Sequence, residues 1–528
     1  RLPATPTPSR AGRHHHPQKY CSVAAYLAVE RSARSSNATS VAPPRARPPT
    51  LRRKSAAHAS SVGSAERLYP QFELDERASV PLWPTMVSSF AAASVVAVVV
   101  FLLRLRARSA SLSTPAALVP DIVLALLCFV LCAFGAQEWA REAQEQARLV
   151  AAEEAGDADS CFREVRGVKV HYKKAAGGEG SSRAAEGEKE QKEEEAPAVV
   201  IGLLHGFGAN TYSYEHGDVP QRLAEVLSRD GHDVLCVFHD MVGFGLTERP
   251  SAVAPYSVRE NAELAWELLA AEARDHFGAE REVRRVLIGH SLGGLQAVTA
   301  AGQHMGNVDA LVLISPAILS TGTGGTWRAG ARSLAGKAAV AVRFALAVLT
   351  ACALALARPV LLLAVRKLVR TARFWRNGLR TAYLRKAAVT QALVDGYRRP
   401  SLVKDWDAGI ERFVRAQALP PWFVAASSPV AALSAAFEAE GGGSGGQKSF
   451  PAALKVLRAL TARGVPVLII HGKQDSVVPA WNSRKLAQAV PGSDFQEVDA
   501  GHCAHEESPG DFVERVAAFL STRLLNQT

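Results

Sequence analysis

Cysteine is scarce in this chain of 528 residues. The seven cysteines are spread over the whole sequence, and no two of them form a C-x-x-C pair. Two of them, Cys128 and Cys132, lie inside a long apolar run. A disulfide framework or a zinc site needs cysteines that cluster at short, regular spacings, so the sequence predicts neither.

Motifs that hold a cofactor are also lacking. No phosphate-binding loop follows any apolar run, and no Rossmann fingerprint stands between a strand signal and a helix signal. No constellation of histidines, cysteines and carboxylates has the spacing of a metal site. We therefore expect a protein that works without a cofactor and without a metal.

Acidic residues are nearly absent from two stretches. Residues 1–65 carry 11 Lys or Arg against one acid, and residues 328–400 carry 15 against one. The rest of the chain has 35 basic and 48 acidic residues, so the net charge of +11 comes from two local segments. A basic charge of this kind does not indicate nucleic-acid binding, and we expect no nucleic-acid partner.

Two long apolar runs follow the basic N-terminal region. Residues 86–103 contain no charge, and residues 116–136 contain only Asp121. Each is close to the ~20 residues that a helix needs to cross a bilayer, and three arginines lie between them. Trp83 and Trp139 fall at the outer ends, where interfacial anchors are common. These features predict a membrane hairpin, with two buried helices of a soluble domain as the alternative.

A serine stands at the centre of the strongest motif. The apolar run Val286 to Ile288 leads into Gly289-His290-Ser291-Leu292-Gly293, and a helix-prone stretch follows. A serine on a sharp strand-to-helix turn needs glycines around it, because a Cβ there would collide with neighbouring backbone. The helix that begins after Ser291 would direct its first N–H groups at a developing oxyanion. The pattern predicts a nucleophilic serine.

Other apolar runs end in polar groups in the same way. Residues 199–204 end at His205-Gly206-Phe207-Gly208, residues 467–470 are followed by Asp475, and residues 495–498 by His502. The carboxyl ends of parallel strands meet at one edge of a sheet, where such sheets place their chemistry. The order serine, acid, histidine is the order of an α/β-hydrolase.

The motifs together resemble a known superfamily. They are LHGFG at 204–208, DMVGFGLTERP at 240–250, GHSLGG at 289–294, HGKQDSVVP at 471–479 and GHCAHEESP at 501–509. From about residue 162 to the C-terminus, the chain resembles the α/β-hydrolase superfamily in its esterase and lipase-like branch, of the AB hydrolase-1 type. HGFG followed by GFGLTERP is particularly similar to plant and algal plastid members.

The resemblance and the alternation of elements imply an α/β fold: a mostly parallel sheet with helices on both faces and a helical cap insertion, preceded by the two-helix hairpin. Residues 164–173 are expected to form the first strand. The expected organisation is a basic N-terminal region at 1–80 that is a transit peptide or a disordered tail, the hairpin at 86–136, a helical spacer at 137–160, the first part of the core at 161–316 with a disordered acidic loop at 177–196, the cap at 317–450, and the second part of the core at 451–528.

The alternation stops between Ser315 and Val465. Residues 344–365 are apolar enough for a third membrane span, but Arg358-Pro359 interrupts them. One full crossing would also put Ser291 and Asp475 on opposite sides of the bilayer. We expect instead a pair of cap helices, apolar on one side and rich in Lys and Arg at 366–399, that lies on an anionic membrane. A cap with solvated arginines is the alternative.

The resemblance also implies roles for single residues. Ser291 is the expected nucleophile, His502 its base and Asp475 the carboxylate that orients the base. The backbone N–H groups of Phe207 and Leu292 are the expected oxyanion donors. His505 is the rival base, and the acids Asp240, Asp494 and Asp499 also lie near strand ends.

The expected activity follows from these roles. Epoxide hydrolases and haloalkane dehalogenases of this fold attack with an aspartate, whereas position 291 is serine, so acyl transfer is favoured. We expect a membrane-associated serine hydrolase that cleaves a lipophilic carboxylic ester and has membrane lipids as partners. An acyltransferase and a non-catalytic, membrane-tethered binding protein are the alternatives. The expected location is a plastid membrane, with another endomembrane as the alternative.

Overall fold

The computed structural model describes residue 142 and residues 144–177, 197–318, 334–424 and 449–525. The predicted basic region at 1–80, the membrane hairpin at 86–136 and nearly all of the acidic loop at 177–196 lie outside the described residues. The described residues include most of the predicted hydrolase core and its cap.

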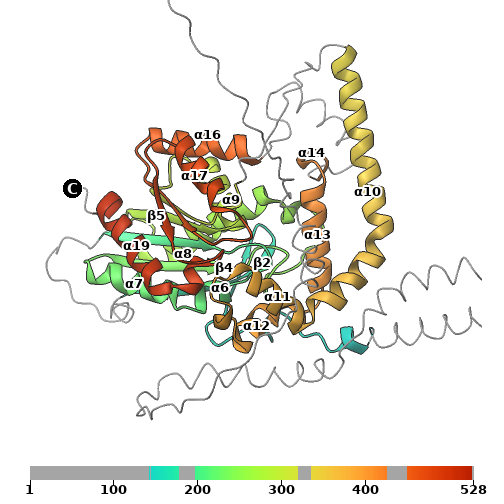
Figure 1. Cartoon of the computed structure of the whole chain (residues 1–528), viewed down its shortest axis with the longest axis horizontal. Coiled ribbons are helices and arrows are strands. Elements are labelled where there is room, and N and C mark those ends of the chain that lie inside the picture. Colours follow the sequence, from blue (N-terminus) through green and yellow to red (C-terminus); the bar gives the residue numbers. More distant parts are fainter. Residues whose placement is uncertain (1–141, 143, 178–196, 319–333, 425–448, 526–528) are drawn as a thin grey trace, which may run out of the picture. The chain divides into compact units, whose positions relative to one another are not determined.

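An eight-stranded sheet forms the centre of the core (Figure 1). Its strand order is β1-β2-β4-β3-β5-β6-β7-β8, and all pairs from β4 onward are parallel, whereas β2 pairs antiparallel with β1 and β4. The strands are β1 (Cys161–Val165), β2 (Val168–Ala176), β3 (Ala198–Leu204), β4 (Asp233–His239), β5 (Val283–His290), β6 (Ala310–Ile314), β7 (Val467–Gly472) and β8 (Asp494–Val498). This mostly parallel sheet confirms the α/β part of the predicted fold class, whereas the predicted hairpin lies outside the described residues.

The first predicted strand is wrong in one respect. Residues 164–173 do not form a single strand, because the chain reverses at Arg166 and Gly167, both of which have positive φ (54° and 71°). Val165 and Val168 then pair directly across a two-residue hairpin loop. Such a loop requires φ > 0 at both positions, which glycine adopts freely and arginine does not. The alternating pattern continues through the turn, so the period alone did not reveal it.

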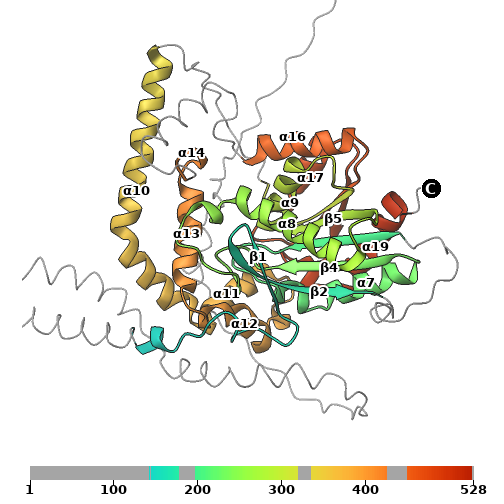
Figure 2. The ribbon, with the colours of Figure 1, turned by 180° about the vertical axis from the view of Figure 1, so that it is seen from behind.

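Helices cover both faces of the sheet, as expected (Figures 1 and 2). On one face lie α8 (Val258–Phe277), α9 (Leu292–Gln303), α16 (Ser449–Ala462) and α17 (Ala480–Ala489); on the other lie α7 (Val219–Arg229) and α19 (Pro509–Leu520). Strands β3 and β6 are buried along their whole length because both faces are covered. The sheet thereby fixes the positions of the loops at its carboxyl edge.

Local sequence signals set the ends of the core helices. The longest of them, α8, begins after Ser257, whose hydroxyl accepts a hydrogen bond from the backbone N–H of Glu260 at 3.2 Å. Serine at the N-cap with glutamate three residues later is the pattern of a capping box. The helix ends at Gly278, which has a φ of 90°.

The cap consists of α10 (Leu334–Val369), α11 (Ala372–Ala382), α12 (Gln391–Arg398), α13 (Trp406–Ala418) and α14 (Pro421–Val424). The expected interruption at Arg358-Pro359 is wrong: α10 is one continuous helix with Pro359 inside it. Proline removes one backbone hydrogen bond but leaves the rest of a long helix intact, and the packing of α10 against α13 holds both halves. Residues 344–369 therefore lie in one long helix, and the Lys- and Arg-rich residues 366–399 continue from its end through α11 and α12.

The basic segment at 366–399 also differs from its prediction. Arg366 and Arg370 pair with Glu142, and Arg366 also pairs with Asp407. Arg399 donates to Asp157 at 2.6 Å. These arginines tie the cap to the segment that precedes the core, so they do not form one solvated basic face.

The predicted helical spacer at 137–160 is helical only in part of its described residues, at 142 and 144–147. Beyond them the chain lies against the cap, where Val150 bridges Val403 and Ala155 is fully buried. Arg399 donates to the carbonyl oxygen of Ala155 at 2.9 Å. Residues 148–160 therefore belong to the packed body rather than to an extended spacer.

Candidate active site

Ser291 lies at a strained turn between β5 and α9. Its φ and ψ are 53° and −113°, a conformation that L residues rarely adopt, and the residue is 9% exposed. The flanking glycines are required: a Cβ on Gly289 would lie 2.3 Å from the carbonyl oxygen of Gly293, and one on Gly293 would lie 2.1 Å from that of Leu204. This is the geometry that the glycine spacing predicted for a serine elbow.

Asp475 and His502 are brought together from the loops after β7 and β8. His502 Nδ1 lies 2.7 Å from Asp475 Oδ2, and both side chains are buried. The backbone N–H groups of Val477 and Val478 donate to Asp475 Oδ1 at 2.8 Å each. Burial alone would raise the pKa of Asp475, but the charge of His502 and hydrogen bonds from His471 and His502 hold this pKa well below its usual range. The carboxylate therefore stays ionised beside the imidazole.

His290 connects this pair to the serine elbow. It precedes Ser291, its Nε2 donates to the carbonyl oxygen of His502 at 3.0 Å, and the two imidazole rings are 4.8 Å apart. Within the described part of the chain, the Ser291 hydroxyl makes no hydrogen bond, including none to His502. Bonds of this kind are often long without a substrate and tighten when one binds.

The rival groups have other partners. His505 is fully buried and lies 3.0 Å from the Ser213 hydroxyl, and burial lowers its pKa to about 3. Asp494 pairs with Arg523 on the surface, and Asp499 is 69% exposed beside Arg385. None of these groups takes the place of His502 or Asp475 beside the elbow.

Asp240 organises the loop that carries the predicted oxyanion donor. Its buried carboxylate accepts from the backbone N–H groups of Thr211 and Leu246, each at 2.7 Å, and lies 2.6 Å from His171 Nδ1. His205 in turn accepts from the N–H of Met241 at 3.0 Å. These contacts give Asp240 and His205 structural roles in holding the loop.

The predicted oxyanion donors lie on two elements that meet at the elbow. Leu292 is the first residue of α9, where backbone N–H groups have no partner within their own helix. A Cβ on Gly206 would come within 3.2 Å of the Ser291 Cβ, so the loop that continues into Phe207 lies directly against the serine. Both backbone positions are therefore next to Ser291.

An aromatic cluster lies beside this loop. Phe207 and Phe244, which the sequence predicted as pocket lining, have ring centroids 5.4 Å apart. Phe413 on cap helix α13 contacts both rings, at 5.8 Å and 4.8 Å. Sequence reasoning missed Phe413 because nothing local in α13 distinguishes it from an ordinary core residue. Phe244 and Phe413 are 5% and 2% exposed, so within this cluster the half-buried Phe207 has the apolar surface that an acyl chain could contact.

One cap segment binds both loops of the acid–histidine pair. The backbone N–H of His502 donates to the carbonyl oxygen of Ala382 at 2.6 Å, and Ser476, next to Asp475, donates to that of Thr381 at 3.2 Å. Glu507 accepts from the N–H groups of Gly501 and Leu384, at 2.7 and 2.9 Å. We call residues 381–385 the strap. It couples the position of the cap to the predicted catalytic groups.

A buried carboxylate strengthens this attachment. Glu506 accepts hydrogen bonds from the hydroxyls of Tyr383 in the strap, Tyr397 in α12 and Ser213 in the core. Burial raises the pKa of Glu506 above its usual value, although the three donors act in the opposite direction. Sequence reasoning did not identify these residues, because the pairs that they form are separated by more than a hundred positions.

Tyr383→Phe is expected to lower kcat/KM about tenfold and the free energy of unfolding by about 1–2 kcal/mol, because it removes a donor to buried Glu506 and loosens the strap. Tyr172→Phe is the matched control, since the Tyr172 hydroxyl also bonds a buried glutamate, Glu272, far from the strap. It should cost similar stability and leave kcat/KM unchanged. Equal effects of both variants on kcat/KM, measured with urea unfolding alongside, would contradict the positioning role.

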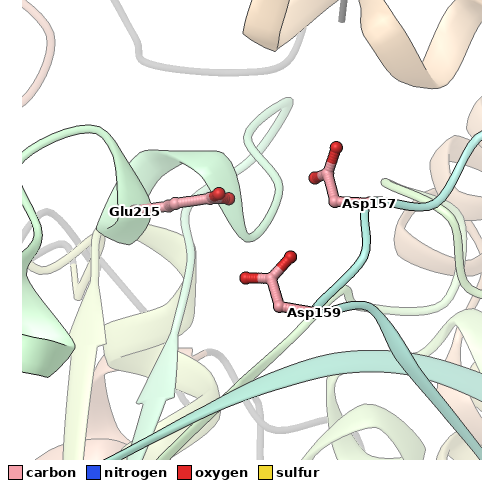
Figure 3. Close-up of side chains that lie close together, drawn as sticks. All are labelled: Asp157, Asp159 and Glu215. Atoms are coloured by element: carbon pink, nitrogen blue, oxygen red, sulfur yellow. The ribbon is translucent and has the colours of Figure 1, made fainter. Parts of the chain in front are cut away.

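Asp157, Asp159 and Glu215 bring three carboxylates close together (Figure 3), the arrangement of a cation site. The cation there is the ammonium group of Lys173, which lies 2.9 Å from each carboxylate and is 1% exposed. Burial would raise the pKa of Asp157, but Arg399 and Lys173 lower it to about 2. The protein thus supplies its own counter-charge, and the cluster does not require a metal.

Lys173→Met is expected to lower the free energy of unfolding by about 1–3 kcal/mol, because it leaves three clustered carboxylates, which are 22% to 59% exposed, without the buried ammonium group. Lys169→Met, on the exposed side of the same strand, should change stability little. The contribution of Asp157 is present above its unfolded pKa of ~4 and is lost as the pH falls toward 2, the direction of a lowered pKa. Urea unfolding of the wild type and the variants at pH 7 and pH 3 measures the loss of stability and its pH dependence. A rise in wild-type stability on adding Ca²⁺ would contradict the assignment of Lys173 as the counter-charge.

An α/β sheet with a serine on a strained elbow, an aspartate–histidine pair beside it and a cap above it defines the class of α/β hydrolases. The sequence model of the alpha/beta hydrolase family matches residues 203–516, and the chain belongs to this family. This confirms the superfamily that the motifs indicated; the similarity to plastid members stays a prediction.

Solved structures similar to this chain are distant in sequence. A meta-cleavage product hydrolase from Pseudomonas fluorescens is 18% identical, with 69% of this chain and 97% of that chain covered and a TM-score of 0.41. A membrane phospholipase A described as a bacterial virulence factor is 17% identical, with 78% of this chain and 100% of that chain covered and a TM-score of 0.40. A thermophilic esterase from Thermogutta terrifontis is 16% identical, with 69% of this chain and 99% of that chain covered and a TM-score of 0.39. A search of curated proteins found no match.

Proposed function

We propose that the protein is a membrane-associated serine hydrolase that cleaves a lipophilic carboxylic ester. The observation that supports this most is the 2.7 Å contact between Asp475 and His502, beside a serine held at positive φ. Family membership gives a hydrolase; ester cleavage and the lipophilic substrate are inferred from the residues around the serine.

In the proposed reaction, His502 removes the proton of Ser291 as its hydroxyl oxygen attacks the ester carbonyl carbon. Asp475 holds the imidazole with Nδ1 as the donor and stabilises the positive charge that forms on it. The N–H groups of Leu292 and Phe207 stabilise the oxyanion. The carbon–oxygen bond then breaks, His502 protonates the leaving alcohol, and water releases the acid by the same steps in reverse order.

A lipophilic acyl group is favoured by the surroundings of the serine. Phe207, Phe244 and Phe413 form an aromatic cluster beside the oxyanion loop, and Phe413 comes from the cap. Burying apolar surface contributes roughly 25 cal/mol per Å², so a long chain gains more here than a short one. We propose a glycerolipid, a galactolipid or a phytyl ester as the substrate class.

The membrane part of the proposal has its support in the sequence. The apolar runs at 86–103 and 116–136 have the length of membrane spans, and the acid-poor N-terminal region is typical of a plastid transit peptide. We propose a plastid membrane as the location. Carbonate extraction of plastid and other membranes tests this; hydrolase recovered in the supernatant would contradict the anchor.

The activity is tested with the full chain in detergent against esters of glycerolipids, galactolipids and phytol. The proposal expects acid release that grows with acyl chain length and is absent in Ser291→Ala. Adding an alcohol acceptor distinguishes the acyltransferase alternative, in which the acyl group would appear mainly on the acceptor rather than as free acid. Lack of turnover for every ester, together with saturable ester binding, would favour the non-catalytic alternative.

A further inference from the structure

The surface of α10 is unusual among the described residues. Six large hydrophobic side chains are exposed in the described part of the chain, and five of them lie on α10. These five are Val342, Leu346, Leu349, Leu356 and Val360, with exposures from 53% to 84%. The most apolar 18-residue window within residues 340–369 has a mean hydropathy of 2.2, and 11% of that window is buried. It is the described helix that is long and apolar enough to cross a membrane.

The exposed side chains share one face of the helix. At 100° per residue the five positions fall within an arc of about 80°, along a length of about 27 Å. We call this face, between residues 342 and 360, the outer strip. No charged or aromatic side chain lies within it, and α10 contains no acidic residue over its whole length. The outer strip is therefore a flat aliphatic surface.

The opposite face of α10 packs on the cap. Val340, Ala347 and Val369 are buried there, at helical spacing, and α13 is the neighbouring helix. Charged contacts cross this side: Arg358 with Glu411 at 3.6 Å, and Arg366 with Asp407. Figures 1 and 2 show α10 and α13 side by side from both directions. The outer strip lies on the side of α10 away from these contacts, and at residues 355–360 the helix is exposed all round.

We infer that the outer strip of α10 docks on an anionic lipid bilayer, with the helix lying in the plane of the membrane. This deepens the membrane association proposed above and does not depend on ester cleavage. Protein partners are bound mainly through aromatic and arginine side chains, which the strip lacks, whereas hydrocarbon requires only aliphatic surface. Exposed basic side chains on α10 and α11, among them Arg343, Arg373 and Arg380, complement an anionic headgroup layer, and neither helix contains an acidic residue.

A crossing of the membrane by α10 is not compatible with its connections. The chain reaches α10 from Ile318, which is buried in the core, and continues from its other end into α11, which leads to the strap. Residues 319–333 would have to return across the bilayer, yet they are fewer than the ~20 residues that a spanning helix needs and include Arg328 and Arg332. The acidic residues of α13 would also enter hydrocarbon. A helix lying flat avoids both costs.

The test uses the full chain reconstituted in vesicles of phosphatidylcholine and phosphatidylglycerol. A fluorophore is attached to one cysteine at a time, introduced as Leu349→Cys, Leu356→Cys or Val360→Cys, and lipids that carry a quencher at a shallow or a deep acyl position are included. Trp481→Cys, an exposed hydrophobic residue on α17, is the control. All native cysteines except the buried Cys236 and Cys503 are replaced by serine: Cys21, Cys128, Cys132, Cys161 and Cys352.

A helix in the plane predicts the same ratio of shallow to deep quenching at all three positions, within about twofold, and at least fivefold less quenching at 481. A ratio that changes steadily from 349 to 360 would mean a crossing and would overturn the proposal. Absence of quenching, with cross-linking at 356 to a second copy or to residues 86–136, would assign the strip to a protein partner instead. Equal quenching in pure phosphatidylcholine would contradict the role of charge.

The same measurement in a Ser291→Ala background separates this proposal from the proposed enzyme. Uniform quenching without activity in the wild type would leave the lipid surface intact and reject the hydrolase. Ester hydrolysis without quenching would support the hydrolase and reject the lipid-binding surface. With both present, Leu349→Gln/Leu356→Gln should reduce turnover of a vesicle-borne ester at least fivefold and leave a short, water-soluble ester unaffected; Trp481→Gln should change neither.

Discussion

Ser291→Ala is expected to lower kcat by about 10⁵- to 10⁶-fold on every ester that the wild type cleaves, the magnitude that loss of a triad nucleophile produces. Without the hydroxyl no acyl-enzyme forms, and only the oxyanion donors and substrate binding remain. KM should change little, because Ser291 contributes little to binding of the ground state. Release of fatty acid from the full chain in detergent, followed at substrate concentrations above and below KM, measures both quantities.

The control is a serine at the same edge of the sheet. Ser315 follows β6, is fully buried and, like Ser291, has a positive φ of 42°. Ser315→Ala should leave kcat within a few-fold of the wild type. A Ser291→Ala variant that kept more than a hundredth of the wild-type rate would exclude Ser291 as the nucleophile.

Asp475→Asn is expected to lower kcat by about 10⁴-fold with the fold intact. The carboxylate accepts a hydrogen bond from His502 Nδ1 at 2.7 Å, so Nε2 is left without a proton and can take one from Ser291. An amide can donate to Nδ1 instead, which puts the imidazole in the tautomer that cannot act as a base. Initial rates of ester hydrolysis at neutral pH measure the loss.

Asp499→Asn tests whether that effect belongs to Asp475. Asp499 lies on the same loop as His502 but is 69% exposed and pairs only with Arg385, so its variant should keep nearly full activity. If Asp475→Asn retained a tenth or more of the wild-type kcat, the acid of the proposed triad would have to be another residue.

The core was predictable because its signals are local. Most of the parallel strands are short apolar runs, and the predicted site residues lie within four positions of a strand end, as Ser291 does after β5 and His502 after β8. The carboxyl ends of parallel strands meet at one edge, so the strand ends alone indicated that Asp475 and His502 would meet. The hairpin at Arg166-Gly167 was missed because alternation continues through the turn.

The cap was less predictable because its contacts are long-range. The continuity of α10 through Pro359 depends on packing against α13, which no local pattern reveals. Strap residue Tyr383 and its partner Glu506 are 123 positions apart, and each alone resembles an ordinary residue of its helix or loop. The basic residues at 366–399 predicted a surface that lies on an anionic membrane, but partners of several of them, Glu142 and Asp157, lie in the segment whose composition predicts a spacer.

The proposed function depends on a serine that becomes nucleophilic through His502. The most direct measurement is reaction of the detergent-solubilised full chain with a fluorophosphonate, followed by mass spectrometry of its peptides. We predict one phosphonylated residue, Ser291, labelled in the wild type and at least a hundredfold more slowly in Asp475→Asn. An unlabelled Ser291 in folded protein, or a label on another serine, would contradict the proposed function.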